Sequence, residues 1–196
     1  MTGINIALIG LLGAFVPLLV WWLNWKVGDG SSGKSRVTYW VGRPNSIGRR
    51  FFGREGDLKV ITKALKGGAD VVLSGGPGTG KSGLAAEFVQ KSKRKGFWTQ
   101  GGKTPEQTLL SLAHHLGFER GARNDDEILF QIRRRLRALP AKILWVIDNL
   151  SDLDQLNQLL NETEKISLLV TTQDGRQNVI PWGVGFQTVG VLDPES

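Results

Sequence analysis

The stretch GGPGTGKS, residues 75–82, decides the fold of this chain. It fits G-x-x-x-x-G-K-[ST], a loop whose glycines let backbone N–H groups wrap phosphate oxygens while the lysine adds positive charge. An apolar run at residues 71–73 precedes the loop, and residues 84–89 carry apolar side chains at helical spacing. A buried strand before the loop and a helix N-terminus after it are what such a site requires. The sequence therefore predicts a phosphate-binding strand, loop and helix here.

A second strand ends on a carboxylate. In AKILWVIDNL, residues 141–150, five consecutive apolar side chains at 143–147 lead to Asp148. A continuous apolar run is typical of a parallel strand buried on both faces. Because parallel strands end at one edge of the sheet, we expect Asp148 to face the phosphate loop and, with the Ser82 hydroxyl, to hold Mg²⁺. Lys81 is expected to reach the β- and γ-phosphates.

The remaining segments alternate between the two secondary structures. We predict further strands at 97–100, 166–172 and 186–192, and helices at 105–117 and 152–160. Another helix begins after Asn124, a preferred capping residue, with acids in its first turn and arginines in its last. Alternating strands and helices around a phosphate loop predict an α/β fold, a P-loop NTPase parallel sheet flanked by helices.

Residues 4–23, INIALIGLLGAFVPLLVWWL, carry no charge. Twenty helical residues span about 30 Å, the thickness of the hydrocarbon core of a bilayer. Three tryptophans stand where the chain would leave the lipid, and basic residues dominate the next 25 or so positions. We therefore predict a single transmembrane helix within residues 1–25, with the N-terminus outside and the rest of the chain in the cytoplasm. A cleaved signal peptide and a buried core helix are the alternatives.

The same segment places small residues on one helical face: Gly3, Ala7, Gly10 and Ala14. Small residues let membrane helices approach closely, which favours self-association, although glycine and alanine are also common in membrane helices generally.

A second match to the loop pattern, GDGSSGKS at residues 28–35, lacks this context. The segment RVTYWVGRPNS comes directly after it, and its β-branched and aromatic residues and Pro44 oppose a helix that begins at Lys34. Glycine, serine and aspartate are also ordinary linker residues. We interpret residues 26–48 as a basic juxtamembrane linker and residues 49–196 as the nucleotide-binding domain.

Composition limits the remaining options. Lys and Arg total 25 against 18 Asp and Glu, a net charge of +7, which suits anionic partners. Without cysteine there is no disulfide, thiolate metal site or thiol nucleophile. His114 and His115 are neighbours on a predicted helix and point apart, which disfavours a shared metal. The four arginines within residues 133–137 could indicate nucleic-acid binding. A solvated helix end, where cations match the helix dipole, explains them better, so we expect no nucleic-acid partner.

Residues 51–196 resemble the NB-ARC group of STAND ATPases, relatives of the AAA+ ATPases. The matching segments occur in the family's order: FFGREGDL (51–58), the loop GGPGTGKS, the strand ILWVIDN (143–149), ISLLVTTQ (166–173) and VGVLDPES (189–196). The resemblance implies that the chain binds ATP or ADP with Mg²⁺. It implies nucleotide contacts from Gly53, Arg54, Gly75, Gly76, Pro77, Gly78, Thr79, Gly80, Lys81, Ser82, Gly83 and Thr172.

Two positions depart from the family's pattern. Gln173 stands where the family usually has an arginine that senses the γ-phosphate, and Arg176 comes three residues later. Asn149 comes after Asp148, so the second acid of this strand is missing, and an amide cannot accept a proton from water as a carboxylate does. We take Lys81, Asp148 and Arg176 as the catalytic candidates and expect slow ATP hydrolysis if any.

The sequence therefore predicts a membrane-anchored ATP/ADP-binding switch of the STAND type, whose nucleotide state controls oligomerisation in signalling or defence. One alternative is an AAA+-like ATPase with sustained turnover, and another is a truncated remnant that binds nucleotide weakly. The helical lid and winged-helix parts that clamp ADP in relatives have no counterpart in residues 1–196, and a longer chain and partner subunits are the two alternatives for supplying them.

Overall fold

The computed structural model describes residues 39–43, 53–118, 124–140 and 143–190. The helices are α2 (Glu55–Lys66), α3 (Lys81–Ser92), α4 (Pro105–Leu110), α5 (Asp125–Arg137) and α6 (Leu156–Glu162), with short 3₁₀ turns η2 (Leu153–Gln155) and η3 (Gln177–Val179). The strands are β1 (Val71–Ser74), β2 (Gly96–Gln100), β3 (Leu144–Leu150), β4 (Ser167–Thr172) and β5 (Gly185–Thr188).

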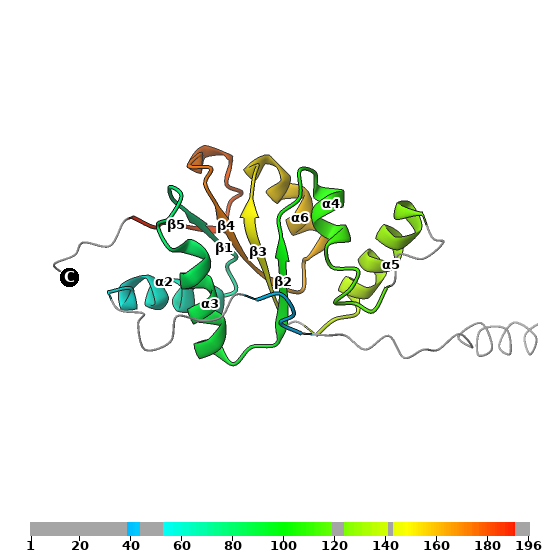
Figure 1. The fold of residues 1–196 in the computed structure, drawn as a ribbon, viewed down its shortest axis with the longest axis horizontal. Helices are drawn as coiled ribbons and strands as arrows, with labels where there is room; N and C mark the ends of the chain where they lie inside the picture. The colour runs from blue at the N-terminus through cyan, green and yellow to red at the C-terminus, as the bar shows by residue number, and fades with distance from the viewer. Residues whose placement is uncertain (1–38, 44–52, 119–123, 141–142, 191–196) are drawn as a thin grey trace, which may run out of the picture. The chain divides into compact units, whose positions relative to one another are not determined.

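The strands form one sheet in the order β2-β3-β4-β1-β5, and every pair of neighbours is parallel. This confirms the expected parallel α/β sheet. The order places β4 between β1, which leads into the phosphate loop, and β3, which carries Asp148. Because all neighbours are parallel, the carboxyl ends of the strands share one edge of the sheet, toward which the arrows of β2 and β3 point in Figure 1.

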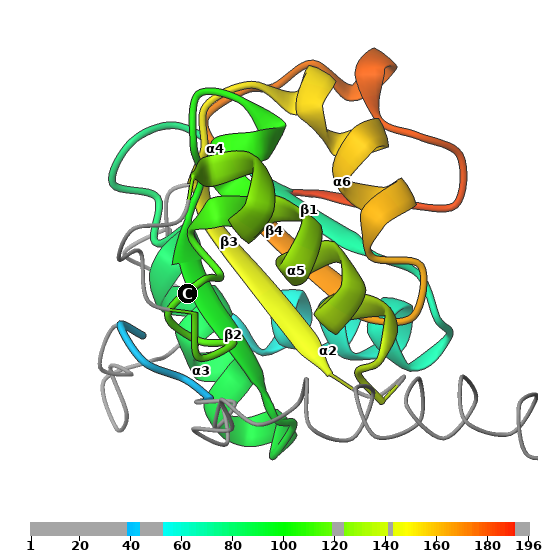
Figure 2. The same cartoon turned by 90° about the vertical axis from the view of Figure 1, so that its right-hand side faces the viewer.

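Two helix layers cover the sheet. On one face, α2 and α3 bury Ile61, Leu65, Leu84 and Phe88 against alternate strand residues such as Val146. On the other face, α4, α5 and α6 bury apolar residues such as Leu109, Ile132 and Leu159 against the opposite side of the same strands, where Trp145 is fully buried. Figure 2 looks onto this second face. Buried apolar residues on both faces explain why the strands read as continuous apolar runs.

The predicted helices agree with the structure in place but not always in extent. The helix predicted at 152–160 is the 3₁₀ turn η2 followed by α6, and α2 was not predicted. The Asn124 side chain accepts a hydrogen bond of 2.8 Å from the Glu127 backbone N–H and caps α5 as predicted. The helix predicted at 105–117 is wrong in extent, because α4 ends at Leu110 and residues 111–117 form turns. There the Leu112 N–H bonds the Leu109 carbonyl three residues back, a tighter spacing than that of an α-helix.

The strand β3 also differs from its prediction, because it continues past Asp148 to Leu150. The register against β4 shifts between Ile147 and Leu150, and Asn149 adopts the left-handed φ of 59°. This irregularity turns the end of the strand at the edge where the phosphate loop lies.

Part of the segment that the sequence assigns to the linker packs on the edge strand β2. The Trp40 backbone N–H donates to the Gly96 carbonyl at 3.0 Å, and its indole Nε1 donates to the Arg94 carbonyl at 2.9 Å. The Tyr39 ring stacks on Phe97, with centroids 5.7 Å apart.

The predicted membrane segment 4–23, the small-residue stripe and the loop-like stretch 28–35 lie outside the described residues. Within the part of the chain that the structure describes, every helix is too short or too polar to cross a bilayer.

Candidate functional site

The predicted phosphate loop connects β1 to α3 at the carboxyl edge of the sheet. Gly80 is the residue before α3 and has a φ of 87°, a left-handed conformation that favours glycine. Gly75 is required for a different reason. A Cβ at this position would lie 2.3 Å from the Val189 carbonyl oxygen, because the chain leaving β5 passes directly beside the loop. Pro77 and Gly78 are exposed at the tip, and Gly83 lies in the first turn of α3.

Lys81 is the first residue of α3 and only 8% of it is exposed. Its Nζ donates to the Gly75 and Gly76 carbonyls at 2.8 and 2.7 Å, so the ammonium lies inside the curve of its own loop. Burial lowers the pKa of Lys81, and the nearby Asp148 carboxylate opposes that change. The cation is therefore held by neutral carbonyl dipoles at the place where the motif predicts a phosphate.

Asp148 lies 6% exposed at the centre of the same edge. Its Oδ1 accepts hydrogen bonds from the Ser82 hydroxyl at 2.7 Å and from the Thr171 hydroxyl at 2.6 Å. The loop and the β3 carboxylate, 66 residues apart in sequence, are thus in direct contact. A carboxylate beside a hydroxyl is an oxygen donor set that fits Mg²⁺, which usually completes its shell with water and phosphate oxygens.

Sequence reasoning missed two residues of this cluster. Thr171 binds Asp148, whereas the predicted nucleotide contact Thr172 instead donates its hydroxyl to the Leu150 carbonyl at 2.7 Å. Gln100 ends β2 in register with Asp148, and its Nε2 lies 3.5 Å from the Asp148 Oδ2. Polar residues at the carboxyl ends of two predicted strands, Gln100 and the pair Thr171 and Thr172, are the signal that could have identified both.

Arg54, the residue before α2, contacts the backbone of the phosphate loop. It is 9% exposed, and its guanidinium donates to the Thr79 carbonyl at 3.0 Å and to the Gly190 carbonyl. It also pairs with Asp57 at 3.2 Å. The exposed Gly53 precedes it with a φ of 74°. The structure therefore brings Arg54 to the backbone of the predicted phosphate loop.

Arg176 lies at the same edge of the sheet but binds other partners. Its guanidinium pairs with Asp174 at 2.7 Å, Asp152 at 2.9 Å and Asp154 at 3.1 Å. Hydrogen bonds from this guanidinium lower the pKa of Asp174 to about 2. Arg176 thus joins the loop after β4 to the loop after β3. Within the described residues, its side chain makes no hydrogen bond to Lys81 or Asp148.

The described side chains by themselves do not form a complete metal site. No group of three or more His, Asp or Glu side chains gathers in the described ranges to form a metal cage. Ser82 and Asp148 alone are too few for a tight site, so a magnesium ion here would need the phosphates of a nucleotide.

The sequence matches no protein-family model and no curated protein. The fold has solved counterparts. A STAND protein with a tetratricopeptide repeat sensor from Pyrococcus horikoshii is 24% identical over 78% of this chain, with a TM-score of 0.51. A Walker-type ATPase of Pyrococcus abyssi is 15% identical over 78% of this chain, with a TM-score of 0.52. The fold is that of a P-loop ATPase.

In this P-loop ATPase fold the residues of the 75–82 loop, Asp148 and the end of β4 lie together. The chain corresponds to 25% of the length of the first of those proteins and 57% of the second. The similarity therefore concerns the nucleotide-binding fold and not the remaining parts of either protein.

Proposed function

We propose that this chain is an ATP/ADP-binding switch of the STAND type, held at a membrane by residues 4–23 with its nucleotide-binding domain in the cytoplasm. Its nucleotide state would control self-association in signalling or defence. The contact between Ser82 and Asp148, 2.7 Å long, is the observation that carries the nucleotide site, because it joins the phosphate loop to the metal carboxylate. Similarity of fold to a STAND protein supports the choice of family.

The residues present fit the proposed ligand. The loop backbone and the N-terminus of α3 offer N–H groups and the positive end of a helix dipole to phosphates. Lys81 would exchange the Gly75 and Gly76 carbonyls for phosphate oxygens. Ser82 and Asp148 would hold Mg²⁺, which neutralises phosphate charge, and Thr171 orients the Asp148 carboxylate.

The residue after Asp148 favours a switch over a motor. Asn149 is exposed, and its backbone N–H donates to the Thr171 hydroxyl at 2.8 Å. Its amide supplies no general base for water, and Asp148 already accepts two hydroxyl bonds. A nucleotide that binds tightly and is hydrolysed slowly is therefore the expected behaviour.

Titration of the full chain with Mg-ATP and Mg-ADP tests this function. Lys81→Ala should abolish binding, while the matched variant Lys34→Ala, in the second copy of the motif, should bind as the wild type does. Equal losses in both variants would contradict the assignment of the site. Sustained turnover would favour the AAA+-like alternative, and the absence of measurable binding by the wild type would favour the remnant.

A further inference from the structure

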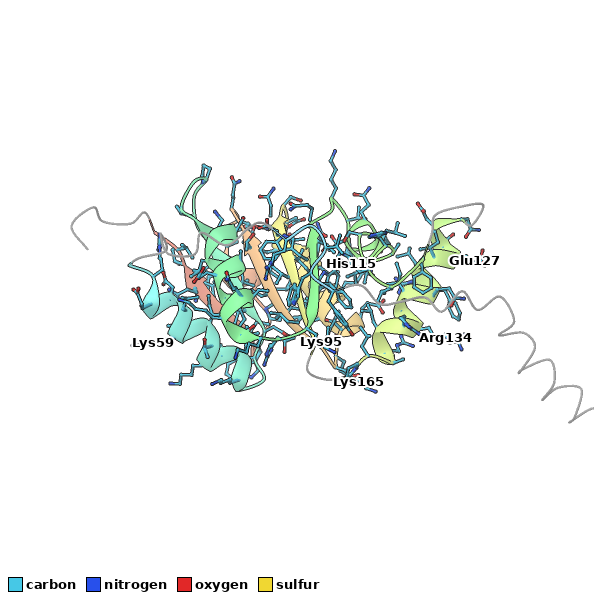
Figure 3. The ribbon with its side chains drawn as sticks, turned by 60° about the horizontal axis from the view of Figure 1, so that its bottom comes forward. Lys59, Lys95, His115, Glu127, Arg134 and Lys165 are labelled. Atoms are coloured by element: carbon cyan, nitrogen blue, oxygen red, sulfur yellow. The ribbon has the colours of Figure 1, made fainter. Side chains whose placement is uncertain are left out.

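The edge of the domain opposite the phosphate loop collects positive charge. Helices that connect parallel strands run against them, so the C-terminal ends of the helices and the amino ends of the strands share this edge. We define the basic edge by its exposed and half-exposed cations: Lys63, Lys66, Lys91, Lys93, Arg94, Lys95, Arg134, Arg135, Arg137 and Lys165. Figure 3 brings this edge forward and shows Lys95, Lys165 and Arg134 across it, with Lys59 on α2 beside them.

Few described acids offset these cations. Glu87 is buried and pairs with Lys91 at 3.2 Å. Glu162 is paired with Arg133 at 2.7 Å, and Asp70 accepts a bond from the Leu168 N–H, which leaves Glu164 as the exposed acid of this edge. The helix dipole explains cations in the last turn of a helix. It does not explain Lys95 and Lys165, which lie in connections outside the helices.

An apolar groove between α2 and α3 opens within this charged surface. Two adjoining hollows of about 570 and 230 Å³ share the lining residues Leu58, Thr62, Lys66 and Lys91. Buried Leu65 and Phe88 complete the floor. The rim is formed by the cations Lys59, Lys63, Lys66, Lys91 and Arg94, with Glu55 as the acid at one end. An apolar floor beneath a ring of ammonium groups complements an amphiphile with an anionic head.

Residues 39 and 40, which lie in the linker predicted after the membrane segment, contact the domain beside this groove. Arg94 lines the groove, its guanidinium donates to the Leu65 carbonyl at 3.1 Å, and its own carbonyl accepts the indole bond of Trp40. The Lys95 Nζ lies 5.7 Å from the centre of the Tyr39 ring. The chain that comes after the predicted membrane segment therefore meets the domain at the basic edge.

We propose that the basic edge, together with the groove between α2 and α3 that opens beside it, docks on an anionic phospholipid surface. The apolar floor favours lipid over nucleic acid, whose phosphate backbone offers nothing to fill it. Docking in this orientation leaves the phosphate loop, at the opposite edge of the sheet, open to nucleotide from solution. The proposal goes beyond the nucleotide switch and rests on the predicted membrane segment only for the tether.

Lysine footprinting of the full chain tests the docking. The chain is reconstituted in nanodiscs of phosphatidylcholine, with or without phosphatidylserine, and is treated with a water-soluble acylating reagent before mass spectrometry. Lys59, Lys63, Lys66 and Lys91 should react roughly tenfold more slowly in the anionic discs, and this protection should disappear at high salt. Lys103, exposed at the opposite edge, should react equally in both discs.

The triple variant Lys59→Gln, Lys63→Gln, Lys66→Gln provides the second arm. Each lysine near an anionic surface changes the docking constant roughly fivefold, so the variant should dock about 100-fold more weakly and Lys91 should lose its protection. The matched control Lys103→Gln should leave the protection unchanged. Equal reactivity of the four lysines in neutral and anionic discs would overturn the proposal, as would stronger protection by a DNA duplex than by anionic lipid.

Two further readouts separate this proposal from the proposed function. Carbonate extraction reports whether residues 4–23 hold the chain in the bilayer, whatever the lysines do. Nucleotide titration of the triple variant should match the wild type, because the three substituted lysines are not among the residues that bind the phosphate loop or Asp148. Loss of nucleotide binding in the triple variant would count against the proposed separation of the two sites.

Discussion

Replacing Lys81 by methionine should separate folding from phosphate binding. Methionine keeps an unbranched apolar stem of similar length and removes the ammonium. In the fold, the Nζ donates two bonds to carbonyls at 2.7 and 2.8 Å. Hydrogen bonds that involve a charged group contribute about 1.5–3 kcal/mol each, whereas burying an ammonium costs several kcal/mol.

Burial of the Lys81 ammonium opposes the gain from its hydrogen bonds. Burial lowers the pKa of Lys81, so the charged form is less favourable in the fold than in water. The nucleotide-free variant should therefore unfold with a free energy within about 1 kcal/mol of the wild type, or higher. For nucleotide, losing two charge-assisted bonds to phosphate costs about 3–6 kcal/mol, which corresponds to roughly 10²–10⁴-fold weaker binding.

Denaturation of the full chain in detergent, with and without Mg-ADP, measures both quantities. Saturating Mg-ADP at about 100 times its Kd should stabilise the wild type by about 2.7 kcal/mol and leave the variant unchanged. Lys103→Met, at an exposed position, is the matched control and should behave as the wild type. A loss above about 2 kcal/mol in the nucleotide-free variant, or full stabilisation of the variant by Mg-ADP, would refute the reasoning.

Further predictions concern the loop, one ion pair and one helix cap. Gly75→Ala should lower the free energy of unfolding by about 2 kcal/mol or more, because its Cβ would lie 2.3 Å from the Val189 oxygen. Gly76→Ala, with its nearest neighbour 3.9 Å away, should cost less in the same denaturant titration. Asp174, with a pKa lowered from 3.8 to about 2 by guanidinium bonds, stabilises the fold above pH 3.8. Its Asp174→Asn variant should therefore melt at a lower temperature than the wild type at neutral pH, and the difference should vanish as the pH falls through 2. Asn124→Ala should cost about 1 kcal/mol in thermal melts, and Asn124→Ser should restore most of that loss.

Features that depend on neighbouring residues were predictable from the sequence. The strand, loop and helix around residues 75–82 are confirmed, as are the positions of all five strands of the described sheet, to within a few residues. The Asn124 cap is confirmed because capping involves a residue only three positions away. The helix predicted at 105–117 failed, since apolar periodicity does not separate an α-helix from a short helix that leads into buried turns. The predicted roles of residues 4–23 and of Arg176 remain predictions.

The residues of the candidate site also differ in how far the sequence predicts them. Lys81 and Ser82 are predictable from the motif alone, because a glycine-rich turn ahead of a helix fixes their place. The partners of Asp148 required the tertiary structure. Thr171 and Ser82 meet this carboxylate only because β4 lies between β1 and β3. Strands buried on both faces have similar apolar sequences, so the sequence leaves their order open.

By itself, the sequence determined the class of fold, the phosphate loop, the five strands and most of the helices, because backbone geometry and apolar periodicity act over short stretches. It did not predict α2. Only the tertiary structure decided which strand ends and helix ends lie at the same edge of the sheet. It brought the carboxyl ends of β1, β3 and β4 together as one site, and it gathered cations from separate helix ends and connections into the basic edge. The physical reason is that strand order and helix direction depend on packing and hydrogen bonding between segments far apart in the chain.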